Sequence, residues 1–426
     1  MHPVRGSRTR RLSVSLLALA LVATTAACSS SKKTVTPPAT TAPPSGGIPA
    51  GLSVKSFDSS FSFMSKFKGL TAAGSGLVGV ILPDTTSSTR YVDFDTPYLT
   101  KAFQAAGYSA SQFKIDNAQG SEATELADAQ ADISLGAKIL LVDQLSTTVG
   151  NQIVSYANAH NVTVIAYDRA IFTGTNTYYV SFDNMQVGRL IGQGFQSCVS
   201  AWGISSPQVF ELSGGEDIDA NAVSFAQGYN SVIWGQAKTP LAAGTKNSQG
   251  WNLVAEQITP GWTNSTGATI FTQQFTAHPQ INATVEANDG LANAVITVLK
   301  TKGVAAKKIP TTGQDATLQG MENVLSGYQC GSVYKPIYLE AQDAVALATI
   351  LRAGKTPPAD LVNSTTTPPQ NVSGTTQPAS LLTPIWVDSK NMNDTVIKDQ
   401  FLGANGTQAL CTAVGAAACQ AAGITP

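Results

Sequence analysis

The sequence is short of charge and of the side chains that bind metals. Asp, Glu, Lys and Arg make up 12% of its 426 residues, and the formal net charge is -1. This composition lacks a basic footprint for nucleic acid, so we expect no nucleic-acid partner. No Cys-x-x-Cys pair occurs, and the histidines are His2, His160 and His278. We therefore expect no metal and no cofactor.

Two catalytic signatures are missing as well. The chain contains neither Gly-x-Ser-x-Gly nor His-Glu-x-x-His, the patterns of a hydrolase nucleophile and of a zinc protease. Nothing in the sequence therefore marks either of these two enzyme classes. Its length exceeds that of an ordinary single domain and predicts two or three domains.

Long apolar runs are scarce, and the one at the N-terminus is too short to span a bilayer as a mature helix. Four arginines, an apolar run over Leu12 to Ala23 and small residues at 25–27 precede Cys28. This pattern predicts a signal peptide over residues 1–27. It resembles a bacterial lipobox, in which the cysteine is lipidated, although Thr25 stands where Leu is usual. A plain secretory cleavage near Ala27 is the alternative.

Residues 28–76 are predicted to be a flexible tether that starts at the lipidated cysteine. Their first half is rich in Thr, Pro and Ser, a composition that cannot bury a core. We expect an extracytoplasmic protein that is lipid-anchored to the bacterial cell membrane and does not thread through it.

Four cysteines remain after Cys28, namely Cys198, Cys330, Cys411 and Cys419. An even number outside the cytoplasm allows two disulfides, and the short spacing favours Cys411 with Cys419, which leaves Cys198 with Cys330. Spacing does not prove connectivity, and free buried thiols are the alternative.

One buried strand ends in an acid and a base. The run Val162 to Tyr167 is apolar and rich in β-branched residues, and Asp168 and Arg169 follow it directly. It predicts a parallel strand buried on both faces. Ligands of open α/β sheets lie at the carboxyl ends of the strands, so the pair is a candidate binding site. A structural ion pair is the alternative.

Strands and helices alternate along most of the chain. Strand-length apolar runs at 77–82, 113–116, 138–143 and 162–167 alternate with helical patterns. A second series of alternating helices and strands begins after residue 185. Repeated βα units predict an α/β fold with two doubly wound parallel-sheet lobes and a ligand between them. Residues 364–378, rich in Thr, Pro and Gln, are expected to form a surface insertion, and 380–387 a last strand.

Seven groups of short motifs carry a resemblance to a known family. They are Ala166-Tyr-Asp168-Arg169, Tyr179-Val-Ser-Phe-Asp183-Asn184 with Val187-Gly188, Gly214-Gly215 with Asp219-Ala-Asn221-Ala222, Gly261-Trp262, Asn288-Asp289, Gly313-Gln314-Asp315 and Val333-Tyr-Lys335-Pro336. In this order and spacing, the chain from Leu77 onward resembles the periplasmic sugar-binding proteins of bacterial ABC transporters. It is most similar to the D-xylose-binding branch of the ribose-type family.

The resemblance implies the type I periplasmic binding protein fold, in which a three-crossing hinge joins the lobes. The crossings are expected near Val180 to Phe182, near Lys335 and Pro336, and near Leu382 to Trp386. We therefore expect an N-terminal lobe of residues 77–181 plus 336–380 and a C-terminal lobe of 182–335 plus 381–426.

The resemblance also implies a sugar site. Phe225 departs from the ribose-type pattern, which has Arg there, and Asn221 offers a polar contact instead. Sugar hydroxyls donate and accept, so acids, bases and amides suit them, and an aromatic side chain covers the apolar ring face. A helix cap for Asn288 and a core position for Trp262 are the alternatives. The predicted ligand-binding residues are Arg90, Asp168, Arg169, Asn221, Trp262, Asn288, Asp315 and Lys335.

The resemblance implies a monomeric solute-binding lipoprotein that captures a monosaccharide, xylose or a related aldose, and delivers it to the membrane subunits of an ABC permease. Such a protein binds and releases its ligand without chemistry, so we expect that it is not an enzyme. A sugar sensor that presents its ligand to a signalling receptor keeps the same fold and is one alternative. A secreted glycosidase is the other, because paired carboxylates also serve that chemistry.

Overall fold

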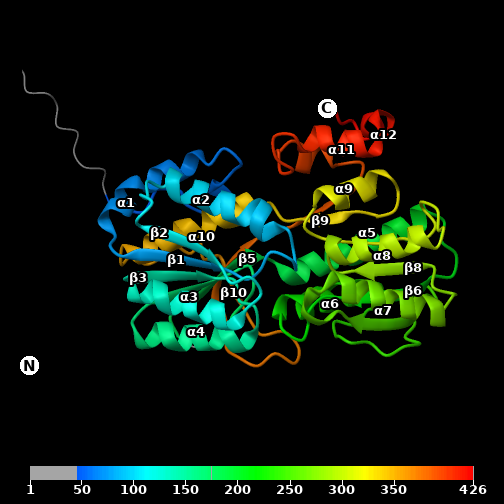
Figure 1. Ribbon diagram of the computed structural model, residues 1–426, viewed down its shortest axis with the longest axis horizontal. Coiled ribbons are helices and arrows are strands. Elements are labelled where there is room, and N and C mark those ends of the chain that lie inside the picture. The colour runs from blue at the N-terminus through cyan, green and yellow to red at the C-terminus, as the bar shows by residue number, and fades with distance from the viewer. Residues whose placement is uncertain (1–45, 174, 426) are drawn as a thin grey trace, which may run out of the picture. The chain divides into compact units, whose positions relative to one another are not determined.

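Figure 1 shows a computed structural model of the protein, which describes residues 46–173 and 175–425. The predicted signal peptide, Cys28 and the first part of the tether lie outside the described residues.

The first lobe is built on a seven-stranded sheet with the order β10-β11-β5-β4-β3-β1-β2. Neighbouring strands are parallel except at the edge, where β10 runs antiparallel to β11. Strands β1, β3 and β4 are buried almost throughout, as a sheet covered on both faces requires. The strands are β1 (Leu77–Leu82), β2 (Phe113–Asn117), β3 (Ala137–Val142), β4 (Thr163–Tyr167), β5 (Thr177–Phe182), β10 (Ser364–Thr366) and β11 (Gln377–Leu382).

Helices cover both faces of this sheet (Figure 1). On one face lie α3 (Glu122–Ser134) and α4 (Thr147–Ala159), and on the other lie α1 (Lys68–Ala73), α2 (Thr96–Ala105) and α10 (Ile337–Arg352). Serine side chains at positions 121 and 146 accept bonds from the first-turn backbone of α3 and α4, which fixes where these helices begin.

The prediction of a flexible tether over residues 28–76 is wrong for its second half, which is folded. Residues Val54–Ser56 and Ser62–Phe67 form 3-10 helices and lead into α1, and Met64, Phe67 and Leu70 are fully buried in the core of the first lobe. The apolar residues of this short segment pack on the first lobe, an outcome that composition alone does not predict.

The second lobe has a smaller parallel sheet with the order β7-β6-β8 and a two-stranded antiparallel ribbon of β9 and β12. A 3-10 turn, Pro260–Trp262, follows β7. The strands are β6 (Gln208–Ser213), β7 (Asn252–Ile258), β8 (Ala283–Glu286), β9 (Ser332–Tyr334) and β12 (Ile385–Val387), and the helices are α5 (Asn184–Ala201), α6 (Ala220–Ile233), α7 (Asn264–Ala277), α8 (Asp289–Thr301), α9 (Leu318–Leu325), α11 (Gly406–Val414) and α12 (Ala416–Ala421).

Two glycines let α5 and α6 approach each other closely. A Cβ on Gly188 would lie 2.1 Å from the carbonyl oxygen of Phe225, and one on Gly228 would lie 2.7 Å from the Cα of Gly188. Side chains at either position would force the helices apart. The contact fixes α6, whose first turn carries Asn221 toward the first lobe.

The chain passes between the lobes after β5, between β9 and α10, and between β11 and β12. These are the segments where the resemblance places the hinge. The predicted last strand, 380–387, is divided here into two strands in different sheets, because β11 pairs with β5 and β12 pairs with β9. The predicted surface insertion, 364–378, contributes the edge strand β10.

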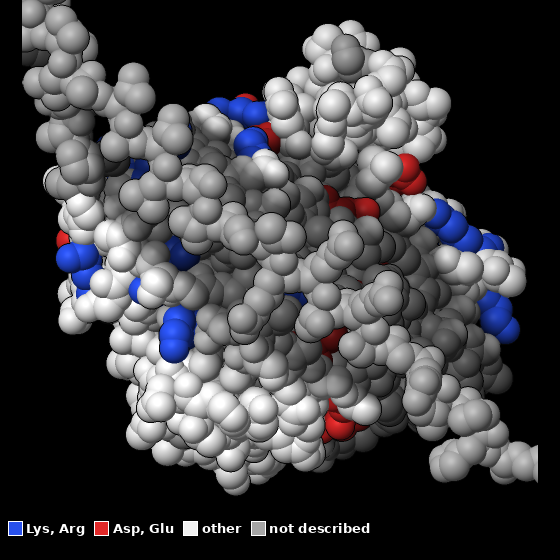
Figure 2. All heavy atoms as spheres, turned by 60° about the vertical axis from the view of Figure 1, so that its left-hand side comes forward, with Lys and Arg blue, Asp and Glu red and all other residues white. Residues whose placement is uncertain are grey.

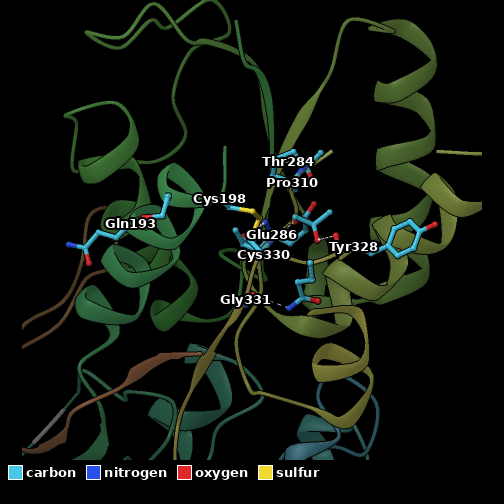
Figure 3. The surroundings of a disulfide bond; sticks show 12 residues. Gln193, Cys198, Thr284, Glu286, Pro310, Tyr328, Cys330 and Gly331 are labelled. Atoms are coloured by element: carbon cyan, nitrogen blue, oxygen red, sulfur yellow. Dashed lines mark hydrogen bonds between the residues drawn. A yellow bond between two sulfur atoms is a disulfide. The ribbon is translucent and has the colours of Figure 1, made fainter. Parts of the chain in front are cut away.

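Two disulfides lie in the second lobe. Cys198 of α5 is bonded to Cys330, which precedes β9, and the pair lies beside Glu286 at the end of β8 (Figure 3). Cys411 of α11 is bonded to Cys419 of α12. These are the two pairs that the spacing favours. The first bond ties α5 to the strand that leads into a hinge crossing.

Charged side chains lie scattered among uncharged ones on the face seen in Figure 2. Between residues 46 and 425, residue 174 aside, the structure has no helix that is long and apolar enough to cross a bilayer.

Candidate functional site

All eight residues predicted to bind a ligand line one pocket between the lobes. With the lobes in contact as they are here, the pocket has a volume of about 30 Å³. Asp168 and Arg169 follow β4, Asn288 follows β8, and Lys335 follows β9. The residues after β4 and β8 gather because the carboxyl ends of parallel strands face the cleft in open α/β sheets, whereas Lys335 arrives from the antiparallel ribbon at a hinge crossing.

Six further residues line the same pocket and were not predicted as ligand contacts. The hydroxyls of the first loop could have been anticipated, because the segment after β1 is rich in Ser and Thr. Asp84 shapes this loop, since its carboxylate accepts bonds from the backbone of Thr86 and Ser87 at 2.7 and 2.6 Å. The further lining residues are Ser87, Ser88, Tyr91, Asp219, Phe225 and Gln314.

Arg90 binds three carboxylates that lie far apart in the sequence. Its Nε and Nη2 donate to both oxygens of Asp95 at 2.9 and 2.8 Å, Nη2 also donates to Glu340 at 2.8 Å, and Nη1 donates to Asp168 at 2.6 Å. Four of its five N–H groups are therefore used within the protein. Arg90 orients Asp168 and has one N–H left for a ligand.

Three cations hold Asp168 ionised. Burial alone would raise the pKa of this carboxyl, but Arg90, Lys335 and Arg169 outweigh burial and lower the pKa below its usual value. Burial likewise lowers the pKa of Lys335, and the charges of Asp168 and Asp315 more than restore it. The site therefore presents a carboxylate and an ammonium group at neutral pH.

Lys335 and its neighbours keep bonding capacity free. Its Nζ lies 3.7 Å from Asp168 Oδ1 and 3.4 Å from Asp315 Oδ1. Within the described residues, Asp315 Oδ1 and Gln314 Oε1 are buried without a hydrogen-bond partner. Buried polar atoms are costly when unpaired, so this side of the pocket suits a ligand with hydroxyl groups.

Asn288 caps a helix and also lines the pocket. Its Oδ1 accepts a bond from the Leu291 N–H at 2.9 Å and so caps α8. Within residues 46–173 and 175–425, its Nδ2 has no protein partner and belongs to the pocket lining. The cap thus aims the amide donor at the cleft.

Arg169 is held between the lobes. It donates to the carbonyl of Gln144 and the hydroxyl of Tyr91, both at 3.1 Å, and its Nε lies 3.6 Å from Asp219 Oδ2. Burial lowers the pKa of Arg169, but Tyr91 and the acids Asp219, Asp143 and Asp168 raise it well above its usual value. Arg169 is therefore a fixed cation that links the first lobe to an acid of the second.

Trp262 lies flat on a glycine and faces the pocket. A Cβ on Gly214 would lie 2.1 Å from the indole ring, so only glycine leaves room for it. The indole Nε1 donates to Asp219 Oδ2 at 3.2 Å, and Phe225 meets the ring edge-on. The aromatic face is thus positioned by hydrogen bonding and packing together.

Asn221 makes its bonds across the cleft. Its Nδ2 donates to the backbone carbonyl of Asp168 at 2.7 Å, and its Oδ1 lies 3.2 Å from the hydroxyl of Tyr179. Ser88 Oγ, from the first lobe, donates to Asp315 Oδ2 of the second lobe at 3.3 Å. The lobes are therefore in contact at this site, and Asn221 bonds to the protein while its amide keeps a second N–H and a second acceptor position.

Three pocket residues have backbone conformations that side chains disfavour. The φ angles are +57° at Asp168, +58° at Trp262 and +93° at Asp315. Such conformations each cost on the order of 1–3 kcal/mol and concentrate at functional sites. Their grouping here supports a functional role for the pocket.

The comparisons with known proteins agree with this geometry. The family model described as "Periplasmic binding protein domain" matches residues 78–356. The D-xylose-binding periplasmic protein of Escherichia coli (strain K12) is 32% identical over 289 residues, which cover 67% of this chain and 80% of that protein. The multiple sugar-binding periplasmic receptor ChvE of Rhizobium radiobacter is 28% identical, with 78% of this chain and 93% of that protein covered.

Solved structures share the fold. A carbohydrate transporter solute-binding protein from Chloroflexus aurantiacus in complex with D-glucose has a TM-score of 0.64 and 24% identity, covering 77% of this chain and 97% of that one. An ABC transporter solute-binding protein from Clostridium phytofermentans with bound β-D-glucose has a TM-score of 0.65 and 24% identity, covering 78% and 99%. The expected type I fold is confirmed, as is the expectation that the protein is not an enzyme. The chain belongs to the periplasmic binding protein family, whose members bind solutes without transforming them.

Proposed function

We propose that the protein captures an aldose in its pyranose form, xylose or a close relative, between the two lobes. The observation that carries the proposal is the single pocket shared by all eight predicted residues. Its ionised Asp168, fixed Arg169 and free Asn288 amide supply acceptor and donors for ring hydroxyls, and Trp262 supplies an apolar face. The relatives named for D-xylose and for multiple sugars support the same ligand class.

The mechanism is hinge closure. Asp168 and Arg169 belong to the first lobe, and Trp262, Asn288 and Asp315 to the second, so a sugar reaches both sets when the cleft is closed. A ligand shifts such an equilibrium only through its higher affinity for the closed state. Delivery of the sugar to the membrane subunits of an ABC permease completes the function.

A panel of pentoses and hexoses tests the proposal. We expect D-xylose or a related aldopyranose to raise the thermal unfolding midpoint, because a ligand that binds only the folded state stabilises it. Calorimetry should then give one site per chain. A panel in which no pentose or hexose shifts the midpoint would overturn the proposal.

We further propose that Cys28 is lipidated and anchors the protein to the cell membrane. One acyl chain gives only marginal membrane binding, so stable anchoring needs the several chains that bacterial lipoproteins carry. The full chain should therefore fractionate with membranes and a Cys28→Ala variant should be released. Equal membrane association of both proteins would contradict the anchor.

A further inference from the structure

The insertion after β10 forms a strap, residues 367–376, that is fixed to the first lobe. The Thr375 N–H donates to the carbonyl of Phe172 at 3.0 Å, and Gly374 approaches so closely that a Cβ there would lie 2.1 Å from the same oxygen. Strand β10 anchors the other end by pairing with β11. In Figure 1 the strap is the orange loop below β10.

The strap reaches the second lobe through Gln370. Its Oε1 accepts from the Thr239 N–H at 3.3 Å and its Nε2 donates to the Thr239 carbonyl at 3.1 Å. The Gln370 N–H also donates to Gln227 of α6 at 3.5 Å. A groove of about 470 Å³, lined by both lobes and the strap, lies beside this contact. The strap therefore bridges the lobes on the hinge side of the cleft.

The position of Thr239 depends on two carboxylates beneath it. Thr239 is 2% exposed, and its hydroxyl oxygen lies 2.6 Å from Glu256 Oε1 and 3.0 Å from both oxygens of Glu216. A hydroxyl has one proton and can donate to only one of these groups. The other carboxyl must carry a proton of its own to bond to the hydroxyl oxygen.

Among the described residues, no cation forms an ion pair with the acid cluster of Glu211, Glu216 and Glu256. The titratable groups that face it are Asp217 after β6 and Tyr229 on α6. None of the ion pairs in the described part of the chain involves the cluster.

One oxygen of Glu211 accepts from Trp234 at 2.7 Å, and the other has no partner among the described residues. Burial raises the pKa of Glu216 to about 7, and the neighbouring charge of Glu256 adds to the effect. Burial also raises the pKa of Glu211 and of Glu256. The cluster therefore holds protons at mildly acidic pH and loses one near neutrality.

We propose that the Gln370–Thr239 contact is a clasp that holds the lobes closed, and that a proton shared in the acid cluster governs its strength. The inference rests on the hinge closure of the proposed function, because Gln370 belongs to a strap fixed to the first lobe and Thr239 belongs to the second lobe. When the proton leaves, negative charge flanks the Thr239 hydroxyl on both sides and displaces the backbone to which Gln370 bonds. The clasp is strongest below about pH 7 and weakens as the pH rises through that value.

Small-angle scattering of the unliganded protein at pH 6 and pH 8 tests the clasp. We expect the wild type to be more compact at pH 6 than at pH 8, and Gln370→Ala to be expanded at both. Ser373→Ala, an exposed position on the same strap, is the matched control and should follow the wild type. Glu216→Gln keeps a permanent donor beside Thr239 and should stay compact at pH 8.

Calorimetry with the best-binding aldose adds a second readout. Two hydrogen bonds of ordinary strength predict about a tenfold loss of affinity in Gln370→Ala at pH 6 and a flattened pH profile. Gln370→Ala with the dimensions and pH response of the wild type overturns the clasp, and Glu216→Gln that expands at pH 8 overturns the role of the proton. If no aldose binds the wild type, the proposed function fails while scattering still decides the clasp.

Discussion

The side chain of Asn221 donates a 2.7 Å hydrogen bond to the backbone carbonyl of Asp168 across the interlobe cleft. One partner begins α6 in the second lobe and the other ends β4 in the first lobe. The bond therefore joins the two lobes directly.

Replacing Asn221 with Ala should weaken closure more than it alters the pocket lining. The loss leaves the Asp168 carbonyl without this donor, so we expect sugar affinity to fall roughly tenfold and the sugar-bound protein to be less compact. Calorimetry and small-angle scattering measure the two effects. Asn405→Ala, at an exposed position that makes no side-chain cap bond, is the control. An Asn221→Ala protein that closes normally would show that the bond merely accompanies closure.

Arg90 should matter more for stability than for recognition, because it bonds to Asp95, Asp168 and Glu340 in the core of the first lobe. Removing one partner of a buried ion pair typically costs about 3–5 kcal/mol. We expect Arg90→Ala to lose that much in urea unfolding. Arg90→Lys should restore little, because an ammonium group cannot bond both oxygens of Asp95 as the guanidinium fork does. Arg189→Ala on α5 is the control, and equal stability of the two alanine variants would refute this role.

Glu286 should make the protein less stable as the pH rises. Burial raises the pKa of this carboxyl to about 8, although the Thr312 N–H donates to it. A raised pKa means that the folded state holds the proton more tightly, so the stabilisation is complete below the unfolded pKa of about 4.5 and is lost as the pH approaches 8. Glu286→Gln should therefore be more stable than the wild type at pH 8 and should flatten the dependence of the unfolding midpoint on pH. Glu322→Gln on α9 is the control, and parallel pH profiles for wild type and Glu286→Gln would contradict the prediction.

From the sequence we can predict the site residues that directly follow a recognisable strand. Asp168 and Asn288 follow apolar strands, and the parallel-sheet rule brings such ends together whatever the details of packing. The three partners of Arg90 could not be predicted in this way, because they come from residues 95, 168 and 340 and meet only after the lobe has folded.

Other features depend on contacts that no local pattern reveals. The segment 52–73 was predicted to be tether, yet its apolar residues pack on the first lobe. The bond of the Asn221 amide across the cleft was not predicted either. Both outcomes depend on the surface that these residues meet in the folded protein, and only the tertiary structure shows which surface that is.

Trp262 offers the most direct test of the aromatic face, because Gly214 allows the same test without removing the indole. Trp262→Ala should reduce sugar affinity by roughly 1–3 kcal/mol through the loss of a buried apolar face. Gly214→Ala should have a similar effect, since its Cβ would lie 2.1 Å from the ring and push it out of place. Gly47→Ala, where a Cβ meets nothing within 4 Å, is the matched control.

Calorimetry gives the affinities of these variants, and scattering shows whether compaction on adding sugar falls with them. If the indole covers the sugar ring, both site variants should lose affinity, and both should also unfold at a lower temperature than Gly47→Ala, because Trp262 is 4% exposed and packs in the core. Wild-type affinity in Trp262→Ala would show that the ring only fills the core beside Phe225, and the sugar would then owe its binding to the charged residues at the strand ends.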